Sequence, residues 1–299
     1  MEITFWGTSS MVPTKERNHS SLLVSYKSEG FLVDCGEGTQ RQFKITGLPL
    51  TKVTKILISH WHGDHVLGLP GLLQTLNSST TGHRIQVFGP KGTKEQFSLM
   101  QKAFLMEGSE RGLSLEVNDV NDGVFFENDD FFLEARKLQH SVPCLGYSIV
   151  EKDRVHVNIE AARKLGLPEG PMLGKLQKGG SVVWKGKSIK PEDVTYVTKG
   201  KKVTVIMDTE LCQGAVDLAR DADLLVCEAT YANELEEKAR EYKHLTAGQA
   251  ASIANRAGAA RLVLTHFSQR YKTSAKAEED ARGTFDNVVC AKDFMKIKV

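Results

Sequence analysis

The residues His60, His62, Asp64 and His65 follow directly after the apolar run 53–58, and they constrain the chain more than any other feature. An apolar run of this length is typical of a buried strand. Three imidazoles and a carboxylate in so short a segment are typical of a metal site. Because alternate side chains of an extended segment share a face, His60 and His62 can bind one ion, while Asp64 and His65 can turn towards a second. The pattern therefore predicts two metal ions.

Imidazole and carboxylate ligands without a thiolate suit Zn²⁺ and also accommodate Mn²⁺ or iron. The short motif supplies too few ligands for two ions, so further ligands must come from elsewhere in the chain. His140, Asp208 and His266 are the candidates, because each follows an apolar, strand-like run. A catalytic site must also leave a coordination position free for water.

Length and composition bound the class of protein. A chain of 299 residues with 40% hydrophobic residues can bury a large core, and we expect one body over residues 1–299. No apolar run approaches the ~20 residues that span a bilayer, and the first residues do not resemble a signal peptide, so we expect a cytoplasmic protein without a membrane partner. The five cysteines are widely spaced and contain no C-x-x-C pair, which favours reduced, buried thiols.

Strand and helix patterns alternate along the chain and indicate a layered α/β fold. Short strand-like runs fill the first third, at residues 3–6, 21–24, 31–33 and 55–58, and residues 67–76 have helical spacing. Later runs alternate between strand and helix, at residues 203–207, 212–220, 224–228, 247–257 and 262–265. Because the candidate ligands follow strand ends at positions 58, 207 and 265, we expect them to meet along one edge of the sheets.

Residues 151–202 differ from the rest and predict an inserted arm. Glycine and proline interrupt every long element there. The segment has twelve Lys and Arg against six Asp and Glu, a balance of 12 − 6 = +6, which leaves −4 for the remainder of a chain whose total is +2. A basic arm favours a polyanionic partner, because neutralising phosphates and releasing counterions supplies sequence-independent affinity. A lysine-rich, solvated loop is the alternative interpretation.

The ordered ligand set resembles the metallo-β-lactamase superfamily, whose fold is an αβ/βα four-layer sandwich with a two-metal site between its sheets. Finer motifs resemble the ribonuclease Z family of tRNA 3′-processing endonucleases, over nearly the whole chain. Gly170 and Pro171 lie in a segment similar to the tRNA-binding flexible arm of that family. The resemblance therefore implies that the insert 151–202 is such an arm and serves as a tRNA-binding exosite. The other matching motifs are at residues 13–18, 34–42, 228–230, 244–247 and 266–271.

The resemblance implies a role for each candidate residue. One zinc ion would be bound by His60, His62 and His140, the other by Asp64, His65 and His266, with Asp208 bridging the two. Two neighbouring cations would lower the pKa of a shared water towards about 7. Asp64 would also accept a proton from that water.

The resemblance further implies that His244 donates a proton to the leaving oxygen and that Glu228 orients its imidazole. Four residues resemble phosphate or substrate contacts of the family, and the two arginines suit that role because a guanidinium can clamp a phosphate with two hydrogen bonds. These contacts are Lys15, Arg17, Ser268 and Arg270.

Three positions depart from the common family pattern, at Met207, Cys227 and Leu245. Family members often have glycine, histidine and serine there. The departures remove no ligand or proton donor, but they bear on the hydrogen bonds that support the ligands.

We therefore expect a zinc-dependent endoribonuclease that cleaves precursor tRNA after the discriminator nucleotide, leaving a 3′-hydroxyl on the tRNA and a 5′-phosphate on the trailer. Two zinc ions per subunit and no organic cofactor are expected, in a homodimer whose arm presents tRNA to the partner's metals. The alternatives are another two-metal phosphodiesterase or thiolester hydrolase of the same fold, or a non-catalytic RNA-binding subunit. The basic insert argues against another hydrolase of the same fold. The presence of Asp64 and Asp208 argues against a non-catalytic subunit.

Overall fold

The computed structural model describes residues 1–104 and 112–299. The chain divides into two compact units. The first comprises Met1–Glu127, Phe132–Ile149 and Lys202–Val299, and the second comprises Asn128–Phe131 and Val150–Lys201.

Within the described residues, the first unit contains two sheets of seven strands. Strands of the first sheet lie in the order β18 (Lys296–Lys298), β1 (Glu2–Gly7), β2 (Ser21–Tyr26), β3 (Glu29–Val33), β4 (Lys55–Leu57), β5 (His83–Gly89) and β6 (Leu113–Asp119). Strands of the second lie in the order β17 (Val288–Cys290), β16 (Leu262–Thr265), β15 (Leu224–Glu228), β14 (Lys202–Ile206), β9 (Cys144–Glu151), β8 (Phe131–Leu138) and β7 (Gly123–Glu127).

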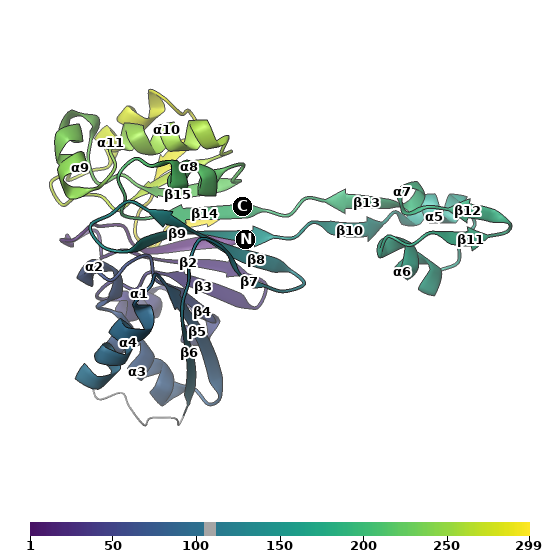
Figure 1. Cartoon of the computed structure of the whole chain (residues 1–299), viewed down its shortest axis with the longest axis horizontal. Helices are drawn as coiled ribbons and strands as arrows, with labels where there is room; N and C mark the ends of the chain where they lie inside the picture. Colours follow the sequence, from purple (N-terminus) through teal and green to yellow (C-terminus); the bar gives the residue numbers. More distant parts are fainter. Residues whose placement is uncertain (105–111) are drawn as a thin grey trace. The chain divides into compact units, whose positions relative to one another are not determined.

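Helices cover the outer faces of both sheets (Figure 1). Those that follow the strands of the first sheet are α1 (Thr39–Thr46), the 3₁₀ turn η1 (Leu50–Lys52), α2 (Gly63–Val66), α3 (Leu69–Ser79) and α4 (Thr93–Ala103). Those that follow the strands of the second are α8 (Gln213–Ala219), η2 (Asn233–Leu235), α9 (Glu236–Tyr242), α10 (Ala247–Ala257) and α11 (Ala275–Arg282). The predicted αβ/βα arrangement is confirmed.

Parallel strands form the centre of the second sheet. Ile206 of β14 pairs with Cys227 of β15, and Glu228 of β15 pairs with Thr265 of β16. Every residue of β15 and β16 is buried, because helices cover one face and the other sheet covers the opposite face. The carboxyl ends of these strands therefore meet along one edge.

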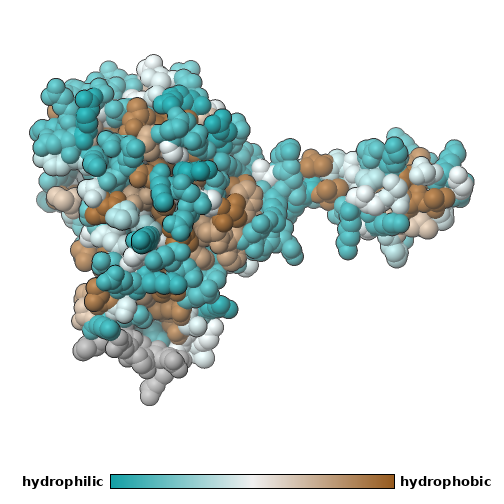
Figure 2. Space-filling model, viewed as in Figure 1, coloured by the Kyte–Doolittle hydropathy of each residue, from teal (hydrophilic) through white to brown (hydrophobic). Residues whose placement is uncertain are grey.

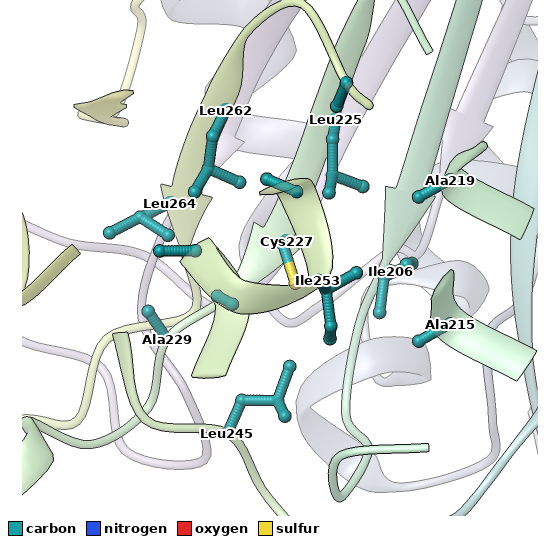
Figure 3. Close-up of a cluster of buried hydrophobic side chains, with 14 of the residues drawn as sticks. Ile206, Ala215, Ala219, Leu225, Cys227, Ala229, Leu245, Ile253, Leu262 and Leu264 are labelled. Carbon is teal, nitrogen blue, oxygen red and sulfur yellow. The ribbon is translucent and has the colours of Figure 1, made fainter. Parts of the chain in front are cut away.

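Each sheet has its own apolar core against its helices. Figure 3 shows the core of the second sheet, where small alanine side chains of α8 and α10 let these helices approach Ile206, Leu225 and Leu264 closely. Helix α10 is fixed at both ends: Thr246 and Gln249 cap its first turn reciprocally, and Gly258 ends it with φ of 66°. These signals explain why residues 247–257 could be predicted as a helix.

The second unit is built from short elements, as the glycines and prolines of residues 151–202 lead one to expect. They are β10 (Arg154–Val157), α5 (Ile159–Lys164), α6 (Pro171–Gln177), β11 (Val182–Trp184), β12 (Lys187–Ile189), α7 (Pro191–Val194) and β13 (Thr195–Thr198). Strands β10 and β13 pair with each other, as do β11 and β12. A small apolar cluster that includes Leu173, Leu176 and Ile189 gives the unit its own core.

In the view of Figure 2, the surface of each unit is mainly hydrophilic and carries scattered small apolar patches. Among the described residues, no helix is long and apolar enough to cross a membrane. All five cysteines are buried and carry free thiols.

A partly buried ion pair joins strands β3 and β4 of the first sheet. The Lys55 ammonium group, which lies over the ring of Phe126 at 4.4 Å, is 2.8 Å from a carboxylate oxygen of Glu29. Burial opposes ionisation of Glu29, but the hydrogen bonds from Lys55 and Thr54 and the charge of Lys55 hold its pKa below the ordinary value.

We predict that Glu29→Gln destabilises the protein by about 2 kcal/mol at pH 7, because it leaves a buried ammonium group without this carboxylate, at a site partly screened by solvent. The pKa of Glu29 is lower in the folded protein than in the unfolded chain. The difference in unfolding free energy between the parent and the variant is therefore largest above the ordinary carboxyl pKa, and it disappears as the pH falls through the lower pKa of the folded protein. Urea unfolding at pH 7 and at steps from pH 5 down to pH 3 measures both. Glu241→Gln, at an exposed glutamate, is the control, and an equal loss in the two variants would contradict the assignment.

Candidate metal centre

The parallel strands of the second sheet bring three of the predicted residues together. Glu228 is the last residue of β15, His266 follows the end of β16, and Asp208 lies two residues after β14. Because Ile206 pairs with Cys227 and Glu228 pairs with Thr265, all three side chains emerge at the same level of the sheet edge. His140 arrives from the neighbouring part of this sheet, two residues after β8.

The short motif that follows β4 contributes the other ligands. The segment leaves the strand at Leu57 and is extended at His62, whose φ is −78° and ψ is 152°. Asp64 and His65 lie in the first turn of α2, not in the extended segment that the alternation argument assumed. The helical turn places both side chains inwards, and both are buried.

One group of donor atoms comprises His60, His62, His140 and Asp208, and its ligand atoms lie within 4.8 Å of one another. His62 Nδ1 is 3.0 Å from His60 Nε2 and 3.3 Å from His140 Nε2. Asp208 Oδ2 is 3.7 Å from His60 Nε2 and 3.9 Å from His140 Nε2.

A second group comprises Asp64, His65, His266 and again Asp208, also within 4.8 Å. Asp208 Oδ1 is 3.5 Å from His65 Nε2 and 3.1 Å from His266 Nε2. Asp64 Oδ2 is 3.3 Å and 3.5 Å from the same two nitrogens. The two oxygens of Asp208 thus face different groups, as a carboxylate between two ions would.

Four of the imidazoles are held by the nitrogen that faces away from the cluster. Nδ1 of His65 contacts Asp34 Oδ2 at 2.7 Å, and Nδ1 of His60 contacts Ser59 Oγ at 3.0 Å. Nδ1 of His266 contacts Thr230 Oγ1 at 2.9 Å, and Nδ1 of His140 contacts the Lys243 carbonyl at 3.0 Å. A proton on each Nδ1 leaves the Nε2 lone pair directed into the cluster. This is the arrangement in which proteins present histidine to a metal.

Buried polar atoms without a hydrogen-bond partner support the same interpretation. Within the described part of the chain, these include His65 Nε2, His266 Nε2 and Asp208 Oδ1, which all belong to the second group. An imidazole lone pair that faces a carboxylate oxygen is repulsive unless a cation lies between them. The donor set of imidazoles and carboxylates fits zinc or manganese.

Without a cation, protonation must balance the charge. Burial opposes a charged imidazole at His65, but Asp208, Asp34 and Asp64 raise its pKa well above the ordinary value. Burial likewise opposes ionisation of Asp208, while His266, His65 and His244 hold its pKa well below the usual range. A bound divalent cation would take over this charge balance.

His244 lies beside the second group, with its own carboxylate partner. Its Nδ1 is 3.1 Å from Glu228 Oε1 and 3.8 Å from Asp208 Oδ2. Burial lowers the pKa of His244, but the charges of Glu228 and Asp208 and the hydrogen bond to Glu228 together raise it to about 9. Thr230 Oγ1 donates to Glu228 Oε2 at 2.6 Å, which fixes the carboxylate that faces the imidazole.

A cavity of about 820 Å³ opens over these residues and is lined by Asp64, Asp208, His244, Ser268 and Arg270, among others. Arg270 is oriented by a hydrogen bond from its Nε to Ser268 Oγ (3.1 Å) and lies over the Tyr231 ring at 5.2 Å. The cavity therefore presents both metal-facing carboxylates and a cation.

The other predicted substrate contacts do not line this cavity. Lys15 is exposed, while the Arg17 guanidinium donates to the Tyr271 carbonyl and lies over the Phe267 ring at 5.6 Å. Gly170 and Pro171 lie in the second unit, where Gly170 precedes α6 with φ of 134° and Pro171 is its first residue.

Sequence reasoning assigned no role to Asp34, Ser59 or Thr230, which hold the ligands. Asp34 accepts hydrogen bonds from the Ser59 amide and hydroxyl, both at 2.7 Å, as well as from His65. Asp34 adopts φ of 56°, which turns its carboxylate towards the motif. Asp34 directly follows an apolar, strand-like run, as the candidate ligands do. This position in the sequence could have identified it.

The three departures from the family pattern lie away from the ligand atoms. Cys227 and Leu245 are packed in the apolar cluster of Figure 3, and Met207 is also buried. At Cys227 and Leu245, van der Waals packing against the helices takes the place of polar contacts.

We predict that Asp34→Asn lowers zinc affinity about 10- to 100-fold, because an amide cannot accept from all three donors and no longer fixes the His65 tautomer. Competition with a chromophoric chelator measures the affinity. Asp217→Asn, at an exposed helix position, is the control. Unchanged affinity in Asp34→Asn would refute the supporting role of this carboxylate.

Comparisons with known proteins identify the fold and the family of the chain. Residues 1–156 match the family model described as anti-Pycsar protein Apyc1, and residues 190–267 match the β-lactamase superfamily domain. The metallo-β-lactamase fold protein YhfI from Bacillus subtilis has a TM-score of 0.71 at 19% identity, over 99% of this chain and 98% of that one, which supports the fold.

Ribonuclease Z relatives match the whole chain. The chain is 41% identical to ribonuclease Z of Methanothermobacter thermautotrophicus, over 100% of this chain and 97% of the relative. It is 37% identical to ribonuclease Z of Methanosarcina acetivorans, over 100% and 98%. The short form of human tRNase Z has a TM-score of 0.72 at 29% identity, over 100% of this chain and 99% of that one. The predicted family is thereby confirmed, and the chain belongs to the ribonuclease Z family of tRNA 3′-processing endoribonucleases.

Proposed function

We propose that the chain is a zinc-dependent endoribonuclease that removes the 3′ trailer from precursor tRNA. Hydrolysis after the discriminator nucleotide leaves a 3′-hydroxyl on the tRNA and a 5′-phosphate on the trailer. Family membership supports the substrate. The observation that carries the chemistry is the convergence of two donor groups on the shared carboxylate of Asp208, beside the His244–Glu228 pair.

In this proposal the first donor group would hold one zinc ion and the second group another, and Asp208, which belongs to both groups, would contribute to each. The four imidazoles held at Nδ1 and the three unpartnered buried atoms support this division. Bound zinc ions supply Lewis acidity, which neutralises charge on a phosphoryl group and lowers the pKa of water at the site.

Asp64 and His244 move the protons. The Asp64 carboxylate lines the cavity, where it would accept the proton that the attacking water loses. Glu228 binds His244 at Nδ1 and leaves Nε2 free to donate a proton to the 3′-oxygen that departs. Ser268 and Arg270 line the same cavity and bind phosphate oxygens there.

The insert 151–202 binds the tRNA, with Gly170 and Pro171 at the start of one of its helices. Its excess of six positive charges supports this role, because backbone phosphates are neutralised by lysine and arginine. Lys15 and Arg17 complete the substrate contacts. We also propose a cytoplasmic homodimer, in which the insert of one subunit presents tRNA to the metals of the other. The free thiols support a reducing compartment.

The direct test incubates the purified protein with a precursor tRNA that carries a 3′ trailer, in the presence of zinc or manganese, and maps the ends of the products. Cleavage after the discriminator nucleotide is expected. No cleavage with either metal would reject the endonuclease.

Two substitutions separate metal binding from proton donation. We predict that Asp208→Ala loses metal and cleavage together, because it removes a ligand from both groups. His244→Ala should keep the metal but slow turnover by ~10² or more, as expected for a lost general acid. Metal analysis and single-turnover kinetics distinguish the two. Equal metal loss in both variants would contradict the division.

Removal of the insert tests its role in binding. The Glu151 amide donates to the Lys201 carbonyl at 2.9 Å, so a short glycine–serine linker can replace residues 152–200 between them. We predict a KM for precursor tRNA raised at least tenfold. Hydrolysis of bis(p-nitrophenyl) phosphate, which needs no insert, serves as the control and should be unchanged. Intact tRNA processing by the shortened protein would refute the role of the insert. If instead the parent protein failed the trailer assay but hydrolysed the small diester, a small-substrate phosphodiesterase would be favoured.

A further inference from the structure

Lys243 has a left-handed backbone conformation at the edge of the metal centre. It follows α9 with φ of 56° and ψ of 52°, and its amide donates back to the last turn of the helix. This conformation brings Cβ close to the neighbouring backbone, so the position after a helix is usually taken by glycine. A lysine there maintains unfavourable backbone geometry that glycine would relieve. Such strain persists where the side chain or the backbone has a function.

The backbone of Lys243 supports the metal centre. Its carbonyl accepts from Nδ1 of His140 at 3.0 Å, which directs the opposite nitrogen of that ring into the first donor group. The next residue, His244, contacts Glu228, and the rings of His140 and His244 are 5.4 Å apart. One turn of chain thus positions both a predicted ligand and the predicted proton donor. This explains why the left-handed conformation is kept, but glycine would serve the backbone equally well.

The side chain of Lys243 explains the choice of residue. Lys243 lines the cavity, and its ammonium group is 3.5 Å from the carbonyl oxygen of His140. That contact uses one of three ammonium protons. The cavity holds the carboxylates of Asp64, Asp208 and Glu241, so a polyanionic substrate needs cations at its rim.

We propose that Lys243 is a substrate-binding residue whose ammonium group binds the RNA phosphate next to the scissile one, while its carbonyl positions His140. The inference rests on the proposed function, in which the metals, His244, Ser268 and Arg270 serve the scissile phosphate and Lys243 serves the neighbouring one. Lysine is then kept at this position, despite its left-handed backbone conformation, because one residue must supply both a cation for the phosphate and a carbonyl directed at His140.

The test compares Lys243→Gly, Lys243→Gln and Lys243→Arg with the parent on precursor tRNA. Glycine keeps the backbone conformation without the cation, glutamine keeps most of the length and a polar end without the charge, and arginine restores the charge. We expect Gly and Gln to raise the KM about tenfold and to reduce the slope of log(kcat/KM) against log[salt] by about 1, since one phosphate contact is lost. Arg should retain the parental KM and slope.

Two further readouts separate phosphate binding from damage to the metal centre. Zinc affinity and hydrolysis of bis(p-nitrophenyl) phosphate, which has a single phosphate, should remain parental in all three variants. The melting temperature of Lys243→Gly should be equal to or higher than that of the parent. Lys27→Gly is the matched control, because Lys27 is also left-handed, with φ of 52°, and lies in the turn between β2 and β3. It should leave tRNA kinetics unchanged.

Parental KM and salt slope in both Lys243→Gly and Lys243→Gln would overturn the proposal. A loss of zinc affinity in Lys243→Gly would also overturn it, because the side chain would then serve the metal centre. Neither result would touch the proposed endonuclease, which fails only if the parent protein does not cleave precursor tRNA.

Discussion

The architecture of this protein depends on placing four carboxylates and several imidazoles together out of water. Asp34, Asp64, Asp208 and Glu228 are all buried, and each is within contact distance of a histidine. Desolvating so many charges is unfavourable unless opposite charge lies close by. Parallel pairing of β14, β15 and β16 meets this requirement, because it brings residues that are distant in sequence to one level of the sheet edge. The helices behind the sheet hold that edge rigid through close packing of small side chains.

Orientation of the rings matters as much as their proximity. Hydroxyl, carboxylate and carbonyl groups hold the outer nitrogens of His60, His65, His140 and His266, so the inner nitrogens need no rearrangement to bind an ion. The hydroxyl of Thr230 contacts both Glu228 and His266. It therefore links the carboxylate that orients the predicted proton donor to a predicted metal ligand. A change at Thr230 would affect both parts of the centre at once.

Much of this could be anticipated from the sequence, and the reason is local. The run before His60 and the alternation after residue 202 are strong periodic signals, and the capping residues of α10 set its ends. The three ligands outside the short motif, His140, Asp208 and His266, required the ordered motif pattern, since a lone histidine after a strand has no distinguishing local feature. The roles of Ser59 and of the Lys243 carbonyl could not be identified, because their contacts with Asp34 and His140 join segments 25 or more residues apart in the chain. The helical turn at Asp64 was also missed, because four residues are too few for helical periodicity. The roles assigned to the ligands and to the insert remain predictions.

The hydrogen bond between Glu151 and Lys201 has an evolutionary consequence. An insertion whose two ends meet leaves the strands on either side in register, so it can lengthen, shorten or be exchanged without disturbing the fold that carries it. Its separate apolar core means that its sequence can drift under selection for recognition alone. Evolution could therefore change the RNA targets by changing the insert, while the residues of the metal centre stayed the same.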